Sequence, residues 1–167
     1  MILAPLWQAL ENSSLAQFVA SSTWAFPTIE TLHVISFVIV LGTIVVMDIR
    51  MLGLTATDYP LTRLSKDTLR ITWIGFVCAA ITGSLLFISK ATDYAINPYF
   101  QRKMICMALA GANMVVFEFL TWRSVKNWDV GGAIPTATKI AAALSLIFWV
   151  LVVFFGRTVG FTLGVFY

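Results

Sequence analysis

The sequence predicts an all-α integral membrane protein, a bundle of four transmembrane helices preceded by an amphipathic interfacial helix. Of its 167 residues, 59% are hydrophobic and only 11% are charged, and the mean hydropathy is +0.89. Soluble domains carry roughly 25% charged residues. Four stretches of low charge each approach the ~20 residues that a helix needs to cross the hydrocarbon core. Helices are expected there because lipid cannot satisfy backbone polar groups.

The first segment, residues 1–26, differs from the rest of the chain. Serines, an asparagine and a glutamine interrupt apolar residues that recur at helical spacing. This pattern predicts one or two short amphipathic helices lying at the membrane interface. Trp24 and Phe26 are then expected at headgroup level, and Pro27 suits the first turn of the first spanning helix.

The chain is expected to form a single membrane domain over residues 1–167. Turn-forming residues such as Asn97–Pro98 and Gly131–Gly132 separate the apolar runs. Residues 158–167 form a C-terminal tail with regularly spaced glycines. The predicted spanning helices are 28–49, 71–90, 103–123 and 139–157.

The distribution of Lys and Arg predicts the topology. The N-terminal segment has neither, whereas the first and third loops together hold more of them than the second loop and the C-terminal segment. Cytoplasmic loops carry such an excess. We therefore expect both termini on the periplasmic side of a bacterial inner membrane. The net charge of +3 is thinly spread, which fits contact with the lipid bilayer rather than with nucleic acid, for which no motif is present.

The best candidates for a functional site are Glu30 and His33, which is the only histidine of the chain. They are three residues apart and share a helix face near the outer end of the first span. Ionisable groups at membrane depth are costly, so they usually pair, face the bundle interior or have a function. The leading interpretation is a hydrogen-bonded pair that holds the helix against the bundle and binds no cofactor. Haem ligation, metal ligation and a proton or substrate step are alternatives, since imidazole suits each of them.

A cofactor would need further ligands. Because the chain has one histidine, haem b would use His33 with a methionine, be five-coordinate, or be shared with another subunit. Copper(I) would suit a cluster of thioether, thiolate and imidazole ligands. The methionines at the right level for haem are Met104 and Met107, and the copper cluster would consist of His33, Met104, Cys106 and Met107.

Two other polar residues lie inside the third predicted span. Glu118 is expected to pair with a basic group at the same level, Arg50 or Arg123. Asn113 lies in the middle of the helix and is expected to hydrogen-bond across the bundle. Both residues are interpreted as structural.

Three glycines near the C-terminus, Gly156, Gly160 and Gly164, are spaced by four, so in a helix they would form one smooth ridge. Such ridges let two membrane helices approach closely. Because the ridge projects beyond the fourth predicted span, it is a candidate interface with another membrane subunit or with a second copy of the chain. The alternative is packing within the chain.

A longer pattern opens with Trp24-Ala25-Phe26-Pro27-x-x-Glu30-x-x-His33 and continues with Gly42 and Asp48-x-Arg50-x-Leu52-Gly53. In this pattern the chain resembles a family of short bacterial inner-membrane proteins catalogued as a domain of unknown function. The resemblance implies four spans and no established activity. Members often carry a histidine near the position of Phe117 or Glu118, and its lack here argues against a two-histidine cofactor site. Further matches are Trp73, Gly75, Phe76, Gly83, Asn97-Pro98-x-Phe100, Lys103, Asn113 and Arg157.

The sequence contains no phosphate-binding loop, nucleophile elbow or zinc-protease motif. We therefore expect a non-catalytic integral membrane subunit that packs against a larger membrane complex, such as a redox or energy-converting one. The first alternative is a b-haem electron-transfer or quinone-facing protein that uses His33. The second is a copper-handling membrane protein.

Overall fold

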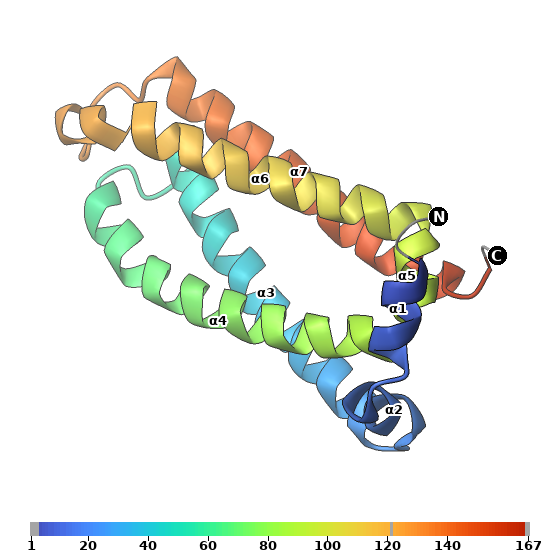
Figure 1. The fold of residues 1–167 in the computed structure, drawn as a ribbon. Coiled ribbons are helices and arrows are strands. Elements are labelled where there is room, and N and C mark those ends of the chain that lie inside the picture. Colours follow the sequence, from blue (N-terminus) through green and yellow to red (C-terminus); the bar gives the residue numbers. More distant parts are fainter. Residues whose placement is uncertain (1–3, 121, 166–167) are drawn as a thin grey trace.

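The computed structural model describes residues 4–120 and 122–165, and of Arg123 only the backbone. This part of the chain is helical and contains no strand. Four of its helices are long and apolar enough to cross a membrane, which confirms the predicted all-α fold of a multi-pass membrane protein (Figure 1). They are α3 (Ala25–Leu52), α4 (Leu61–Ser89), α6 (Pro98–Leu120) and α7 (Thr136–Thr162).

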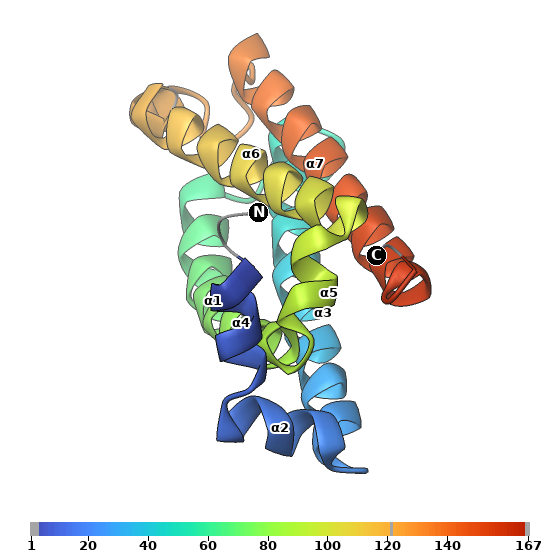
Figure 2. The same ribbon diagram turned by 45° about the vertical axis from the view of Figure 1, so that its right-hand side comes forward.

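Two short helices, α1 (Ala4–Glu11) and α2 (Ser14–Ser21), precede the first span. Ser13 caps α2, because its hydroxyl accepts a hydrogen bond from Ala16 N at 3.3 Å. Both helices lie at the end of the bundle that also carries α5 (Ala91–Ile96), which we call the α5 end (Figures 1 and 2). They expose the large apolar side chains that an interfacial helix presents to lipid, among them Leu6, Leu15 and Phe18.

The N-terminal segment is docked on the α5 end by polar and aromatic contacts. The Glu11 carboxylate accepts hydrogen bonds from Thr92 N at 3.2 Å and from the Thr92 hydroxyl at 2.8 Å. Trp7 packs edge-on against Phe87 near the end of α4, with 5.6 Å between ring centroids. These contacts fix α1 against α4 and α5.

The opposite end of the bundle holds the loop between α3 and α4 and the 3₁₀ helix η1 (Trp122–Asn127), and we call it the η1 end. Here α4 begins at Leu61 rather than at the predicted 71, because Leu61 is fully buried against Val125 and Trp128. The predicted start was taken from the first residue of the uncharged run. The helix begins earlier, at Leu61, because one of its faces is still buried there.

The four spans form two pairs. Helix α3 packs along α4, α6 packs along α7, and the pairs meet where α3 packs against α7. Helices α4 and α6 therefore each pack along one spanning neighbour, and they lie apart in Figure 1. The apolar core between the two pairs is formed by Val40, Cys106, Ala110, Trp149 and Val152.

The close approach of α3 and α4 depends on Gly75. A Cβ atom at this position would lie 3.0 Å from Val40 Cγ2 and 3.2 Å from Ser36 O. A hydrogen bond that the Thr72 hydroxyl donates to the Thr43 hydroxyl, 2.7 Å long, links the same two helices. A small residue combined with an interhelical hydrogen bond is the packing typical of membrane helices.

The start of α6 is fixed by Asn97, which explains the Asn-Pro dipeptide. Asn97 Oδ1 accepts hydrogen bonds from Tyr99 N at 2.9 Å and Phe100 N at 3.2 Å, so it caps the helix. Its amide nitrogen donates to Thr162 O at 3.2 Å and thereby ties the end of α7 to the start of α6. Pro98 suits the first helical position because it lacks a backbone N–H. Lys103 lies further along this fixed helix.

Candidate functional site

His33 lies on α3 and faces α4. Its Nδ1 is 2.9 Å from Ala79 O and 3.1 Å from Thr82 Oγ1. A carbonyl oxygen can only accept a hydrogen bond, so Nδ1 carries the proton and the tautomer is fixed. Nε2 makes no hydrogen bond to any residue that the structure describes. It is therefore the nitrogen that is available to a ligand.

The His33 ring lies directly on Gly83. A Cβ atom at position 83 would be 2.9 Å from His33 Cε1 and 3.3 Å from Nδ1. No side chain fits there unless the ring moves. Ala79 therefore binds the histidine through its carbonyl oxygen, and Gly83 leaves the space that the ring occupies.

Glu30 is exposed and does not hydrogen-bond to His33, so the predicted hydrogen-bonded pair is wrong. The two residues are three positions apart on α3 and therefore share a helix face. The ring instead turns toward the neighbouring helix, where the carbonyl of Ala79 offers an acceptor. A spacing of three predicts the shared face but not the partner that each side chain selects.

Lys103 is a site residue that the sequence analysis did not select. It is half-buried on α6, inside a membrane-spanning helix. Its aliphatic stem lies against Gly156 of α7, where a Cβ atom would be 3.7 Å from Lys103 Cδ and Cε. None of the described groups forms a hydrogen bond or ion pair with its ammonium. The sequence signal that could have identified Lys103 is the presence of a lysine within a segment that spans the bilayer.

Two of the other three proposed cofactor ligands pack in or against the apolar core. Cys106 is buried in the apolar core beside Val40 and Trp149, and Met107 packs against that core. Met104 is exposed. The described residues contain no group of three His, Cys, Asp or Glu side chains that could hold a metal ion.

Arg50 is only 1% exposed and binds backbone carbonyls at the η1 end. Nε donates to Tyr59 O at 3.2 Å, and Nη2 donates to Thr57 O at 3.1 Å and to Asp129 O at 2.8 Å. The first and third loops are thus joined through one guanidinium group. The carbonyls of both loops occupy Nε and Nη2 of the guanidinium group that was expected to pair with Glu118.

Glu118 is exposed on α6 and forms no ion pair with Arg50. The alternative partner, the Arg123 side chain, lies outside the described residues. Asn113 links the two helices of its pair, because its amide donates to Ala141 O of α7 at 2.9 Å.

Asp129 completes the polar contacts of the η1 end. Its carboxylate accepts hydrogen bonds from Thr62 N at 2.9 Å and from the Thr62 hydroxyl at 2.7 Å, at the start of α4. Burial alone would raise the pKa of Asp129. The hydrogen bonds from Thr62 and the charge of Arg50 outweigh it and hold the pKa below its ordinary value.

A second buried polar group at this end is Asp48 of α3. It is only 2% exposed, and its Oδ2 has no partner. Arg50 Nη1 and Thr138 Oγ1 are likewise buried and without partners. The sequence placed Asp48 only at the end of the first helix and gave no sign that it would be buried.

The predicted glycine ridge is interrupted. Gly156 faces Lys103 inside the chain, whereas a Cβ atom at Gly160 would meet nothing within 4 Å. Gly164 lies beyond Thr162, the last residue of α7, and has φ +77°. It therefore belongs to a turn rather than to the ridge, which leaves Gly160 as the open position.

Comparison with known proteins places this geometry in a family. A family of unknown function, DUF6644, matches residues 11–162. The chain belongs to this family. The DUF6644 match runs from the end of α1 to the end of α7 and includes both His33 and Lys103. No curated protein and no solved structure matches the chain.

Proposed function

We propose that this chain is a non-catalytic integral membrane subunit that packs against other membrane proteins in a larger complex, such as a redox or energy-converting one. The observation that carries the proposal is the incomplete packing of the bundle. Helices α4 and α6 each pack along a single spanning neighbour, and Gly160 on α7 has open space beside it. Helix association in lipid relies on such close, small-residue contacts.

The test is co-purification in a mild detergent. Gly160→Leu should release the chain from its partner while leaving it inserted and folded, because the new side chain holds the helices apart. Gly42→Leu is the matched control, since a Cβ atom at Gly42 also meets nothing within 4 Å but lies on α3, which already packs against both α4 and α7. Unchanged co-purification of Gly160→Leu would contradict the assigned interface.

A second candidate function is a b-haem or quinone-facing protein that uses His33. One observation favours it. Nδ1 is anchored on Ala79 O, which is how proteins orient a ligating imidazole and leave Nε2 directed at the ligand. An absorption spectrum of the purified chain tests the haem version, because a Soret band lost in His33→Ala would establish it. The packing of Cys106 and Met107 gives no support to the copper-handling alternative.

We also propose that the chain lies in a bacterial inner membrane with the α5 end on the periplasmic side. The Arg50–Asp129 contact supports this topology, because it holds the first and third loops, which together carry most of the Lys and Arg residues, at one end of the bundle. In a variant without Cys78 and Cys106, a membrane-impermeant maleimide should label a cysteine at Ser13 or Ala95 in intact cells. Labelling at Ser65 instead would reverse the topology.

A further inference from the structure

An apolar groove opens between α6 and α7 toward the η1 end of the bundle. The two helices spread apart there (Figure 2), and the groove has a volume of about 360 Å³. Helix α6 packs along no spanning helix of the described chain except α7, so the groove faces the bilayer. Four of its lining residues are large, apolar and exposed, namely Val116, Leu120, Ile140 and Leu144.

One polar side chain, Asn113, lines this groove. It lies in α6, roughly 10 Å along the helix axis from Leu120, at the end of α6, and therefore at membrane depth. Its amide nitrogen donates one hydrogen bond, to Ala141 O at 2.9 Å. An amide carries two N–H donors and an acceptor oxygen. The second N–H and Oδ1 are thus left without a partner among the described residues.

These two open groups indicate what covers the groove. Lipid acyl chains offer neither a donor nor an acceptor, so a lipid in the groove would leave both groups of Asn113 unsatisfied. A neighbouring protein helix that carries a polar side chain at the same depth satisfies them. The occupant that fits the groove is therefore another membrane-spanning helix with its own donor and acceptor.

A second copy of the chain supplies that helix. When two primary amides face each other, the N–H of each donates to the oxygen of the other, so the open groups of Asn113 are complementary to those of an identical residue. A twofold axis brings the same residue of two copies together. The small residues Ala137 and Ala141 line the α7 side of the groove and leave room for an approaching helix.

We propose that two copies of this chain associate through the groove between α6 and α7, with their Asn113 amides paired across a twofold axis. Val116 and Leu120 of each copy then pack into the groove of the other. This groove lies toward the η1 end, whereas Gly160 lies at the α5 end of α7. The self-association is therefore independent of the partner docking proposed for Gly160, and it is tested on the purified chain alone.

The experiment measures energy transfer between donor-labelled and acceptor-labelled copies of the full chain in phosphatidylcholine vesicles. A cysteine at Ser13, in the variant without Cys78 and Cys106, carries the label. Energy transfer should fall as added lipid dilutes the protein, and its dependence on dilution gives the dissociation constant of the dimer. Asn113→Leu should raise this constant about tenfold, because it removes two interhelical hydrogen bonds of modest strength.

A second variant keeps the test decisive if Asn113→Leu fails to fold. Ala137→Phe leaves the Asn113 amide in place but fills the groove, so it should raise the dissociation constant at least tenfold. Ala80→Phe is the matched control, because Ala80 is also an exposed alanine of a spanning helix but lies on α4. It should leave the dissociation constant unchanged.

Cross-linking locates the interface. In the chain without Cys78 and Cys106, a cysteine at Val116 should form a disulfide between two copies on mild oxidation. A cysteine at Val77, which is exposed on α4, should not. Cross-linking at position 77 but not at 116 would place the interface on α4 and overturn the proposal.

Three other results would also overturn it. The first is a chain that stays monomeric at every dilution. The second is a dimer whose dissociation constant is unchanged by both Asn113→Leu and Ala137→Phe, which would place the contact elsewhere. The third is a monomer that retains a phospholipid in native mass spectrometry and loses it in Ala137→Phe, which would make the groove a lipid site.

Discussion

At the η1 end of the bundle, Arg50 is buried and donates three hydrogen bonds to loop carbonyls. At the α5 end, Lys103 is half-buried and donates none to the described residues. Both are basic side chains near the end of a spanning helix, and both are removed from water. The first charge is therefore bound by the fold, whereas the second has no partner among the described residues.

The two ring nitrogens of His33 show the same contrast between a bound and an unbound polar group. Nδ1 is bound to α4 through Ala79 O and contributes to packing, while Nε2 is unused by the described residues. Asp48 resembles it at the η1 end, since one carboxylate oxygen is buried without a partner. That oxygen is enclosed between α3 and α7, however, and Asp48 is only 2% exposed.

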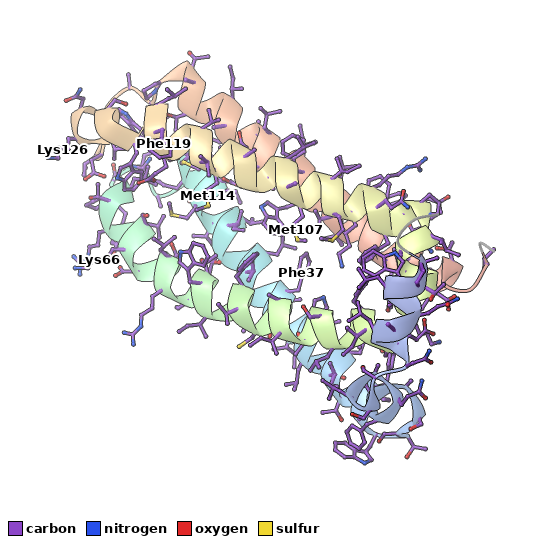
Figure 3. The ribbon with its side chains drawn as sticks, in the orientation of Figure 1. Phe37, Lys66, Met107, Met114, Phe119 and Lys126 are labelled. Carbon is purple, nitrogen blue, oxygen red and sulfur yellow. The ribbon has the colours of Figure 1, made fainter. Side chains whose placement is uncertain are left out.

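The largest effect is expected at Arg50. Arg50→Met would leave the carbonyls of Thr57, Tyr59 and Asp129 without their donor, and we expect a loss of about 3 kcal/mol or more in the free energy of unfolding. Thermal unfolding in a nonionic detergent measures it. Lys66→Met is the control, because Lys66 is exposed at the same end (Figure 3) and should change stability by no more than about 0.5 kcal/mol. Similar unfolding temperatures for the two variants would remove the distinction between buried and exposed cations.

A smaller loss is expected for His33→Ala, about 1–2 kcal/mol, because the hydrogen bonds from Nδ1 to α4 disappear. Combining it with Thr82→Val should cost less than the sum of the two changes, since the residues share a contact. Unfolding of the two single variants and the double variant gives the coupling. Full additivity would show that the Thr82 contact contributes nothing.

Asp129 should make the stability of the η1 end depend on pH. Its folded pKa lies below the ordinary 3.8, so its contribution is complete above that value and is lost as the pH falls through the folded pKa. Asp129→Asn should therefore cost about 1 kcal/mol at pH 7 and progressively less below pH 3.8, where the native carboxylate is protonated as well. Parallel unfolding series against pH test this, and a gap between the two proteins that stays constant down to strongly acidic pH would contradict it.

The smallest effect is expected for Glu30→Gln, within about 0.5 kcal/mol, because Glu30 is exposed and is not hydrogen-bonded to His33. The change should also be additive with His33→Ala. Strong coupling between the two changes would restore the hydrogen-bonded pair that the sequence spacing suggested.

The sequence was sufficient to predict the spans and the N-terminal helices, because run length and helical periodicity are local properties. It was not sufficient to predict partners. Glu118 and Arg50 were predicted to pair because they lie at the same depth in the membrane. Arg50 instead binds carbonyl oxygens of the following loop, and no residue spacing in the sequence indicates this. Gly164 continued the glycine spacing, yet α7 ends at Thr162.

For the same reason, the sequence was sufficient to predict the residues of the candidate site but not their placement. A lone histidine in an apolar run is visible in the sequence, and so is a lysine in a spanning segment. How the helices that carry His33 and Lys103 are placed depends on α7 and on the Asn97 cap. This placement is decided by tertiary packing, which depends on several segments of the chain together.

The most direct test of the difference between the two ends compares Arg50→Met with Lys103→Met in lipid-stripped protein by thermal unfolding. The same substitution removes a basic side chain from each end. We expect Arg50→Met to be strongly destabilised and Lys103→Met to be as stable as the native chain or more stable, because it removes an unpaired charge from a spanning helix. A loss of stability in Lys103→Met equal to that in Arg50→Met would contradict the account and assign Lys103 to the fold.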